Sequence, residues 1–470
     1  MAAEGLAFVA SVVLARLISP TEFGRAAIAG IVIAFALGTA GQGIGSPLVQ
    51  MRALRSDHVR AALLLSVLWG GAAAALTVGV SFLVRPIFDH RTIELIRLAA
   101  PAFALAAVGA VPQALTQRQL DFRRLSIAEV IAALAAISTS ISLALVGFDG
   151  EALVLGLLAA TATTSGVLLI QTRPGWPGWR GAEMREIAAF GLPASMASLS
   201  YTASRNVDYA IVGARLGPTI TGFYWRGYQL GVEYQSKISG ILLRVAFPVF
   251  SRAEDLDAIR DLRARIVRLH AVLLFPLLGT LIVIAPVFVP WLYGERWAPA
   301  GTLTQLLAVG GMAVAIATGT GPLMLATGHP KALRNYNLTS VVLFGCMVYL
   351  VAPYGIVTVC VAVAAYRVCS LVATQYFLVQ RLVGIPLRET LLSDAAPAAT
   401  STAGLVAVGV PLLAVLTRIG AATWLALGVT SIVCLVTYGV ILTMLFPGAR
   451  SDFDRLAARL LPHRRGTSTT

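Results

Sequence analysis

The sequence predicts an all-α integral membrane protein with about fourteen transmembrane helices, arranged as two parallel-repeat six-helix lobes plus two C-terminal helices. Of its 470 residues, 57% are hydrophobic and only 12% are charged, roughly half the charged fraction of a soluble domain. Apolar runs of about 20 residues, each long enough to span a bilayer core, recur along the chain. A motif near residue 20 recurs near residue 218. These observations exclude an ordinary soluble domain.

The apolar runs define the predicted spans and their short connections. We place the spans at 3–18, 26–48, 61–84, 94–115, 125–147, 152–171, 187–213, 219–246, 267–292, 301–326, 336–352, 355–380, 396–417 and 421–446. Connections such as 250–268 are expected to be basic loops. The glycine-rich run 41–45 lies inside a span with no strand before it, so it is not expected to bind a dinucleotide.

The distribution of Lys and Arg predicts the orientation of the chain. Counted on alternating sides of the spans, these residues number 23 on one side and eight on the other. Short cytoplasmic loops carry the excess of basic residues, so we expect both termini in the cytoplasm of a bacterial inner-membrane protein. The net charge of +14 is therefore topological and does not predict nucleic acid as a partner. The four cysteines lie in apolar runs without metal-ligand spacing, and we expect no metal or cofactor.

An internal repeat organises the spans. The segment LARLISPTEFG (14–24) resembles GARLGPTITGF (213–223), so that Ala-Arg-Leu, Pro-Thr and Gly align about 199 positions apart with a one-residue gap. Six helices lie between the copies, which gives both halves the same orientation. We therefore predict an N-terminal lobe at 1–180, a C-terminal lobe at 181–390, two additional helices at 391–448 and a cytoplasmic tail at 449–470.

Ionisable residues inside the spans point to a functional site, because charges are costly in hydrocarbon and usually face a cavity or a partner. The eighth span carries Arg226, Glu233, Lys237 and Arg244. Their spacings of 7, 4 and 7 put all four on one face of a regular helix. The seventh span adds Arg205 and Asp208, and the twelfth adds Arg367.

Two interpretations of these charges remain open from the residues alone. They are internal salt bridges, for which Glu233–Lys237 and Arg205–Asp208 have favourable helical spacing. Alternatively, they line a cavity, where an excess of cations suits an anionic cargo such as a phosphate or pyrophosphate. On the second interpretation the substrate-binding candidates are Arg205, Arg226, Lys237, Arg244 and Arg367, and the ion-coupling candidates are Asp208 and Glu233. No Walker A, HExxH or G-x-S-x-G motif occurs, so we do not expect an enzyme.

Several segments together resemble the polysaccharide transporter family of Wzx-like oligosaccharide flippases, in the multidrug/oligosaccharidyl-lipid/polysaccharide (MOP) superfamily. They are LARLISPTEFG (14–24), GIGSPLVQ (43–50), QRQLDFRR (117–124), NVDYAIVGARLG (206–217), GFY (222–224), AFPVFS (246–251) and YGERWAPA (293–300). The resemblance covers most of residues 10–330, and the last two helices match only in hydropathy.

The resemblance implies a function and partners that the residues alone do not give. It implies translocation of polyprenyl-diphosphate-linked sugar units for O-antigen, capsule or exopolysaccharide assembly, by alternating access around a cationic central cavity. The implied partners are the lipid-linked oligosaccharide substrate, membrane lipids and the polysaccharide polymerase or chain-length machinery. Two alternatives stay open: a multidrug or metabolite antiporter of the same superfamily, and a polysaccharide polymerase or ligase enzyme. The latter is disfavoured because no long periplasmic loop is predicted.

Overall fold

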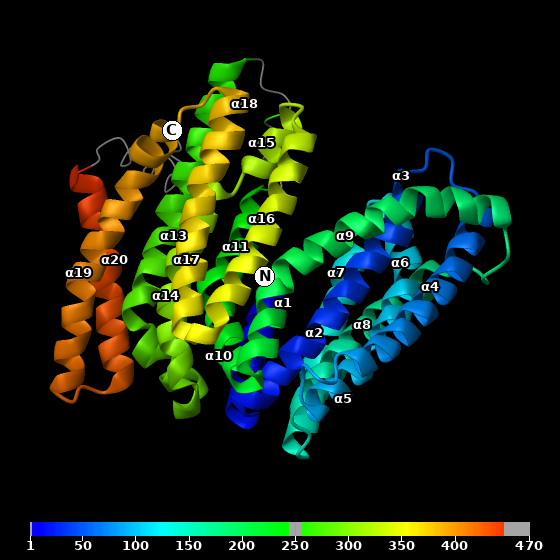
Figure 1. The fold of residues 1–470 in the computed structure, drawn as a ribbon, viewed down its shortest axis with the longest axis horizontal. Helices are drawn as coiled ribbons and strands as arrows, with labels where there is room; N and C mark the ends of the chain where they lie inside the picture. The colour runs from blue at the N-terminus through cyan, green and yellow to red at the C-terminus, as the bar shows by residue number, and fades with distance from the viewer. Residues whose placement is uncertain (1, 244–249, 251–254, 446–470) are drawn as a thin grey trace, which may run out of the picture. The chain divides into compact units, whose positions relative to one another are not determined.

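The computed structural model describes residues 2–243, 250 and 255–445, and this part of the chain consists of helices joined by short turns, with no strand (Figure 1). Eleven of its helices are long and apolar enough to cross a membrane. The other three predicted spans coincide with the short apolar helix near the N-terminus and with two helical segments between residues 181 and 243. The predicted all-α membrane fold of about fourteen spans is confirmed, and the protein is a multi-pass membrane protein.

The helices of the first half follow the predicted spans closely. They are α1 (Ala2–Leu17), α2 (Pro20–Ala40), η1 (Gly41–Gly45), α3 (Ser46–Gln50), α4 (Ser56–Leu83), α5 (His90–Ala99), α6 (Ala102–Arg118), α7 (Phe122–Leu145), α8 (Gly150–Thr172) and α9 (Gly181–Leu216). Helix α2 begins at a proline, which has no N–H to leave unbonded, and the Ser19 hydroxyl caps it by accepting from the Glu22 N–H. The segment η1 is π-helical and joins α2 to α3 without a break.

The second half continues in the same way. Its elements are α10 (Pro218–Tyr228), η2 (Gln229–Glu233), α11 (Tyr234–Leu243), α13 (Leu256–Tyr293), η3 (Glu295–Trp297), α14 (Ala298–Ala317), α15 (Thr320–Ala326), α16 (Pro330–Val351), η4 (Ala352–Tyr354), α17 (Ile356–Ala373), η5 (Thr374–Gln380), α18 (Arg381–Val383), η6 (Glu389–Ala395), α19 (Ala396–Arg418) and α20 (Thr423–Leu445). The segments η2, η5 and η6 are π-helical.

The helices belong to two compact units. The first unit comprises Met1–Trp225, Leu292–Trp297 and Val348–Ile356, and the second comprises Arg226–Trp291, Ala298–Met347 and Val357–Thr470, as far as these residues are described. The lobe boundaries expected at residues 180 and 390 stay a prediction.

The first unit is held together by small residues at helix crossings. In it α2 packs against α5, α6, α8 and α9, and α6 packs against α4 and α8. Ala29, Ala36, Ala99 and Ala107 are fully buried in its core. Small side chains let helix backbones approach closely, which is how helices associate when lipid removes the hydrophobic driving force.

The two copies of the repeated motif cross each other within the first unit. The Oγ1 atoms of Thr21 and Thr219 lie 2.8 Å apart. A Cβ added at Gly24 would lie 1.7 Å from the Pro218 carbonyl oxygen, and a Cβ added at Gly222 would lie 2.0 Å from the Pro20 carbonyl oxygen. The contact is reciprocal, so that each copy contributes the same backbone positions to the crossing of α2 and α10.

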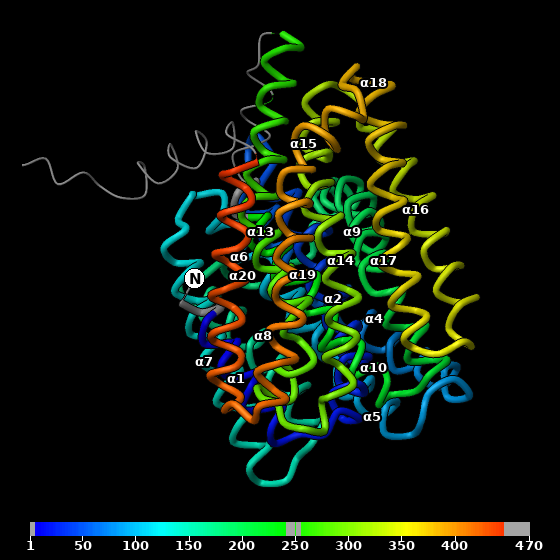
Figure 2. The backbone as a smooth tube through the Cα atoms, turned by 90° about the vertical axis from the view of Figure 1, so that its left-hand side faces the viewer, coloured from blue at the N-terminus to red at the C-terminus, as the bar shows by residue number. Residues whose placement is uncertain are grey.

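The second unit has a core built largely from α13, α14, α19 and α20. Figures 1 and 2 show α19 and α20 side by side, next to α13. A Cβ added at Gly409 of α19 would meet the side chains of Cys434 and Val283. The two added C-terminal helices therefore pack directly on this unit.

One predicted connection is wrong. The expected basic loop 250–268 is largely the first part of α13, which begins at Leu256. Its apolar residues Ile259, Leu262 and Ile266 recur at helical spacing and pack on a buried cluster. The first part of α13 carries too many charges to be recognised as an apolar run. The sequence therefore predicts the span only from residue 267, and the predicted loop extends too far along the chain.

Candidate functional site

The charged residues of the predicted site lie on the least apolar helices. Neither α9 nor α10–η2–α11 is among the eleven apolar spans. On α9, Arg205 is exposed and its Nη1 donates to the Tyr201 hydroxyl at 3.3 Å. The guanidinium carbon lies 6.0 Å from the centre of the Tyr201 ring. Arg205 is therefore tied to a residue one turn earlier on the same helix.

A π-helical segment changes the geometry of the predicted stripe on the eighth span. Between Arg226 and Lys237 the chain passes through η2, whose hydrogen bonds skip one more residue than those of an α-helix. A π-helical turn thus holds one residue more than an α-helical turn. The residues after η2 are therefore turned about the helix axis by about 100°, the rotation per residue, relative to where a regular helix would place them. The assumption that these charges share one regular helical face is wrong for this reason.

The environments of the stripe residues differ accordingly. Arg226 is fully buried and its Nη1 donates to Gln229 Oε1 at 2.8 Å. Glu233, the last residue of η2, is half-buried. Lys237 is exposed, with its Nζ 5.6 Å from the centre of the Tyr234 ring. Arg244 lies outside the described residues.

Arg367 of α17 lies beside α10 within the second unit. Its Nη2 donates to the Tyr228 hydroxyl at 3.0 Å, and its guanidinium carbon lies 5.0 Å from the centre of the Phe344 ring. Tyr228 is two residues from Arg226 on α10. The structure thus brings Arg367 to the same helix that carries Arg226, which the sequence separation of the two residues gave no reason to expect.

Asp208 is a buried carboxylate in the first unit. Its Oδ2 accepts from the hydroxyl of Tyr224 at 2.8 Å, and its Oδ1 accepts from the Tyr209 backbone N–H at 3.0 Å. The rings of Tyr209 and Tyr224 meet edge to face. Among the described residues no group of three or more His, Cys, Asp and Glu is arranged to hold a metal ion.

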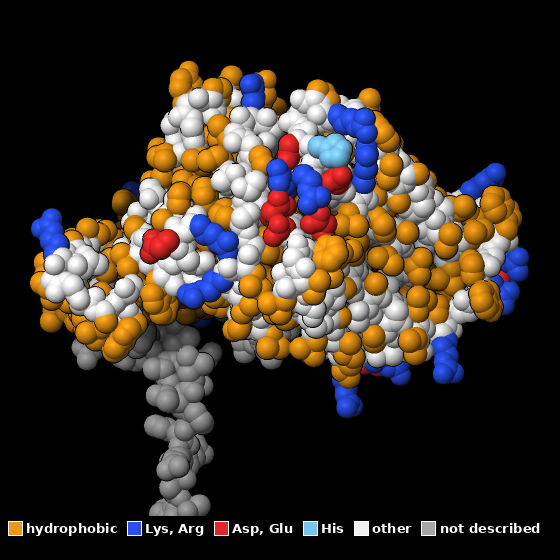
Figure 3. Space-filling model, turned by 90° about the horizontal axis from the view of Figure 1, so that it is seen from below, with side chains coloured by type: hydrophobic (Ala, Val, Ile, Leu, Met, Phe, Trp, Pro, Cys, Tyr) orange, Lys and Arg blue, Asp and Glu red, His pale blue; other side chains and the backbone are white. Residues whose placement is uncertain are grey.

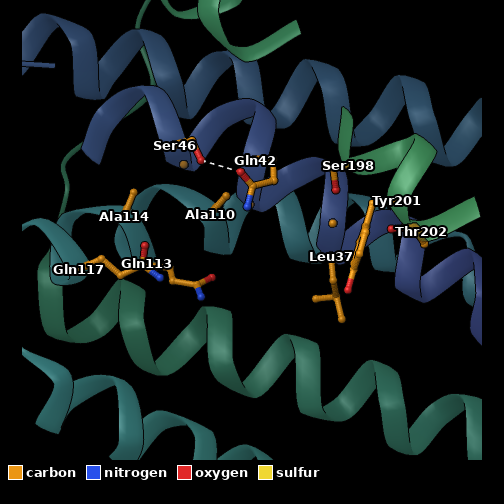
Figure 4. A pocket seen from close by; sticks show the side chains of 13 residues that line it. Leu37, Gln42, Ser46, Ala110, Gln113, Ala114, Gln117, Ser198, Tyr201 and Thr202 are labelled. Atoms are coloured by element: carbon orange, nitrogen blue, oxygen red, sulfur yellow. Dashed lines mark hydrogen bonds between the residues drawn. The ribbon is translucent and has the colours of Figure 1, made fainter. Parts of the chain in front are cut away.

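A pocket in the first unit escaped the sequence analysis. It has a volume of about 460 Å³ and lies between α2–η1–α3, α6 and α9 (Figure 4). Its lining combines small residues with uncharged polar side chains: Gln42, Gln113, Gln117, Ser198, Tyr201 and Thr202. The sequence signal is three glutamines, with Gln42 and Gln113 inside the predicted spans 26–48 and 94–115 and Gln117 two residues beyond the second span, and only charged residues were taken as candidates.

A network of ion pairs joins α2, α5 and α8 in the first unit. Arg25 pairs with Glu22 and Asp89, and Arg91 pairs with Glu94 and Glu151. Figure 3 shows a cluster of acidic and basic side chains with a histidine on a face that is otherwise mainly hydrophobic or uncharged. Partial burial acts to raise the pKa of Asp89, but hydrogen bonds from Thr92 and Arg25 outweigh it and lower that pKa below its ordinary value.

Comparison with known proteins connects these features to a family. Residues 13–301 match the family model described as "Polysaccharide biosynthesis protein". The lipopolysaccharide biosynthesis protein WzxC of Escherichia coli K12 is 25% identical over 83% of this chain and 80% of its own length. A membrane protein in the cps region of Klebsiella pneumoniae is 24% identical over 81% of this chain and 80% of its own.

The fold has counterparts among solved structures. The structure of the lipid II flippase MurJ in an inward closed conformation aligns with a TM-score of 0.74 at 12% identity, covering 95% of this chain and 97% of MurJ. At this identity the likeness shows the fold alone. The resemblance to Wzx-like polysaccharide transporters is confirmed by the family match, which spans more than half of the sequence, and by the WzxC relative. The chain belongs to the polysaccharide biosynthesis protein family of multi-pass membrane proteins.

Proposed function

We propose that the chain is a flippase, which moves polyprenyl-diphosphate-linked oligosaccharide units from the cytoplasmic to the periplasmic leaflet of a bacterial inner membrane. Family membership and the name of the WzxC relative support a role in making lipopolysaccharide, capsule or exopolysaccharide. The likeness to MurJ supports a fold that can carry a lipid-linked saccharide. Alternating access between two repeats would carry the sugars through the interior while the lipid tail stays in the bilayer.

The observation that carries the proposal is the set of cations on α9, α10–η2–α11 and α17. An ionised group facing lipid is costly, so Arg205, Lys237 and Arg367 are expected to face water or a ligand. A guanidinium binds a phosphate through two parallel hydrogen bonds. A diphosphate linker is the part of the proposed cargo that needs such groups. A cationic drug, the usual cargo of a multidrug antiporter, would be repelled by them.

The rest of the proposal concerns orientation, coupling and partners. The excess of Lys and Arg on one side supports cytoplasmic termini. Asp208 and Glu233 are the candidates for carrying a coupling proton or sodium ion, and Asp208 is the more buried. The chain would act as a transporter and not as an enzyme, and hand its cargo to a polymerase and chain-length machinery.

A deletion strain tests the proposal. Loss of the gene should abolish the surface polysaccharide and leave lipid-linked units on the cytoplasmic leaflet, and the wild-type gene should restore export. A strain that keeps its polysaccharide but becomes sensitive to cationic drugs would instead favour the antiporter.

A further inference from the structure

We propose that the pocket between α2–η1–α3, α6 and α9 binds the uncharged sugar portion of the cargo, separately from the cations that would hold the diphosphate. This inference rests on the proposed function, because it assigns one part of the same cargo to one place. The pocket volume of about 460 Å³ falls within the roughly 300–1,000 Å³ of small-molecule sites. It suits a mono- or disaccharide.

The chemistry of the lining selects a neutral, hydroxyl-rich ligand. None of the residues that line the pocket is Asp, Glu, Lys, Arg or His. A phosphate group would find no cation in it, and a cationic drug would find no carboxylate. Glutamine amides and the hydroxyls of Ser198, Tyr201 and Thr202 both donate and accept hydrogen bonds without net charge. Sugar hydroxyls need such partners.

Lipid is an unsuitable neighbour for the same side chains. Gln42, Gln113 and Gln117 belong to helices that cross the membrane, with Gln117 in the last turn of α6 beyond the predicted span 94–115, and Gln42 and Gln117 are exposed. A polar amide in hydrocarbon without a hydrogen-bond partner is strongly disfavoured. Gln113 and Gln117 are one turn apart on α6, so both are on one face of that helix. This face is therefore built to meet water or a polar ligand.

The π-helical segment η1 builds one wall of the pocket. It places Gln42 against the Ser46 hydroxyl, which donates to Gln42 Oε1 at 2.9 Å. In Figure 4 the amide nitrogen of Gln42 points away from Ser46 into the pocket. On the other side of η1, Gly43 meets Gly191 of α9 so closely that a Cβ at Gly191 would lie 1.9 Å from the Gly43 carbonyl oxygen. Single π-turns within α-helices are frequent at functional sites.

Tyr201 links the pocket to the diphosphate candidate Arg205. Its side chain lines the pocket, and its hydroxyl accepts the hydrogen bond from Arg205 Nη1. The two residues are four apart on α9, about 6 Å along its axis. In the proposed cargo the first sugars follow directly after the diphosphate. Such a cargo can place its charge at Arg205 and its first sugars in the neighbouring pocket. On the proposed topology the pocket lies in the cytoplasmic half of the membrane, the side from which the cargo is taken.

Equilibrium binding to the purified protein in nanodiscs tests the inference. The two probes are the lipid-linked saccharide that accumulates in the deletion strain and polyprenyl diphosphate without sugar. Wild type should bind the saccharide form more tightly. Gln113→Leu removes an amide at similar size, and it should weaken binding of the saccharide form about 5- to 10-fold, the equivalent of one or two lost hydrogen bonds. Its affinity for the sugar-free lipid should stay unchanged.

Filling the pocket gives a second variant with a matched control. Gly41 lines the pocket and a Cβ added there meets nothing within 4 Å, so the side chain of Gly41→Leu begins in open space, and leucine is also the better helix former. It should remove the preference for the saccharide form. Gly30→Leu, on the same helix at an equally open position outside the pocket, should leave both affinities at the wild-type value.

The outcomes separate this inference from the function on which it rests. Wild-type affinity for the saccharide form in both pocket variants would overturn the sugar site, as would an equal loss for the two lipids. Arg205→Ala should weaken the binding of both lipids, because it removes a cation that would contact their common diphosphate. A wild-type protein that binds neither lipid would overturn the proposed function itself.

Discussion

Replacing Gly24 by alanine introduces a methyl group at the crossing of the two repeat copies. The new Cβ would lie 1.7 Å from the Pro218 carbonyl oxygen, whereas real Cβ contacts are essentially never closer than 3.0 Å. Helices α2 and α10 would have to separate locally by about 1.3 Å, the difference between these two distances. Because the obstacle is backbone, no side chain can rotate to relieve it.

The energetic effect of this separation follows from the cost of overpacking. Inserting a methyl group into a well-packed site costs typically about 1–3 kcal/mol, and rigid backbone on both sides puts Gly24→Ala at the upper end. We compare molecules in which α2 and α10 are in contact with molecules in which the two helices have separated. A cost of about 3 kcal/mol lowers the ratio of the first kind to the second roughly 100-fold. Gly222→Ala should act similarly, because its Cβ would lie 2.0 Å from the Pro20 carbonyl oxygen.

Disulfide trapping measures this ratio. Thr21 and Thr219, whose Oγ1 atoms are 2.8 Å apart, would be changed to cysteine in a chain whose four native cysteines have been replaced. The pair should cross-link rapidly under mild oxidation, and Gly24→Ala should slow the reaction by one to two orders of magnitude. Gly30→Ala, on the same helix with open space around it, is the control. Cross-linking at the same rate in all three backgrounds would refute the reasoning.

Three further predictions concern a helix end, an ion pair and the exposed cations of the proposed site. Arg118 donates to the carbonyls of Leu48, Val49 and Met51, so Arg118→Ala should lower the unfolding free energy by about 3 kcal/mol, measured by thermal unfolding in detergent. Arg118→Lys should recover part of the lost stability, and an unchanged unfolding midpoint in Arg118→Ala would contradict the prediction. The ionised Asp89, whose pKa is lowered, should stabilise the fold above pH 4 and lose this effect as the pH falls through its folded pKa. Asp89→Asn should therefore show a smaller loss of stability on acidification, and an identical pH profile would be evidence against this ion pair. Arg205→Ala or Lys237→Ala should reduce polysaccharide export while the protein remains in the membrane, as read by immunoblot, and normal export in both would remove these residues from the site.

The number of membrane helices and the limits of most of them could be predicted because hydrocarbon imposes a simple rule on the sequence. A span needs about 20 apolar residues with all backbone groups bonded inside the helix. The predicted span 125–147, for example, corresponds to α7 at Phe122–Leu145. The repeat was also visible, and its Pro-Thr and Gly positions are those that meet where α2 crosses α10.

The details of the site could not be predicted because they depend on departures from the regular helix. Nothing in Gln229–Glu233 marks it as π-helical, yet this segment separates the surroundings of Arg226 from those of Lys237. The contact of Arg367 with Tyr228 joins residues 139 positions apart. Uncharged glutamines were passed over because their cost in lipid is smaller than that of a charge, although three of them mark the pocket.

Reconstitution into proteoliposomes tests the proposed flipping most directly. The lipid-linked saccharide from the deletion strain would be placed in both leaflets, and a membrane-impermeant enzyme that cleaves the sugar would then be added outside. Without the protein about half of the saccharide should stay protected, and with it nearly all should become accessible, more slowly in the Arg205→Ala and Lys237→Ala variants. Persistent protection of half the saccharide in the presence of the folded wild-type protein, under an imposed membrane potential and gradients of protons and sodium ions, would contradict the account.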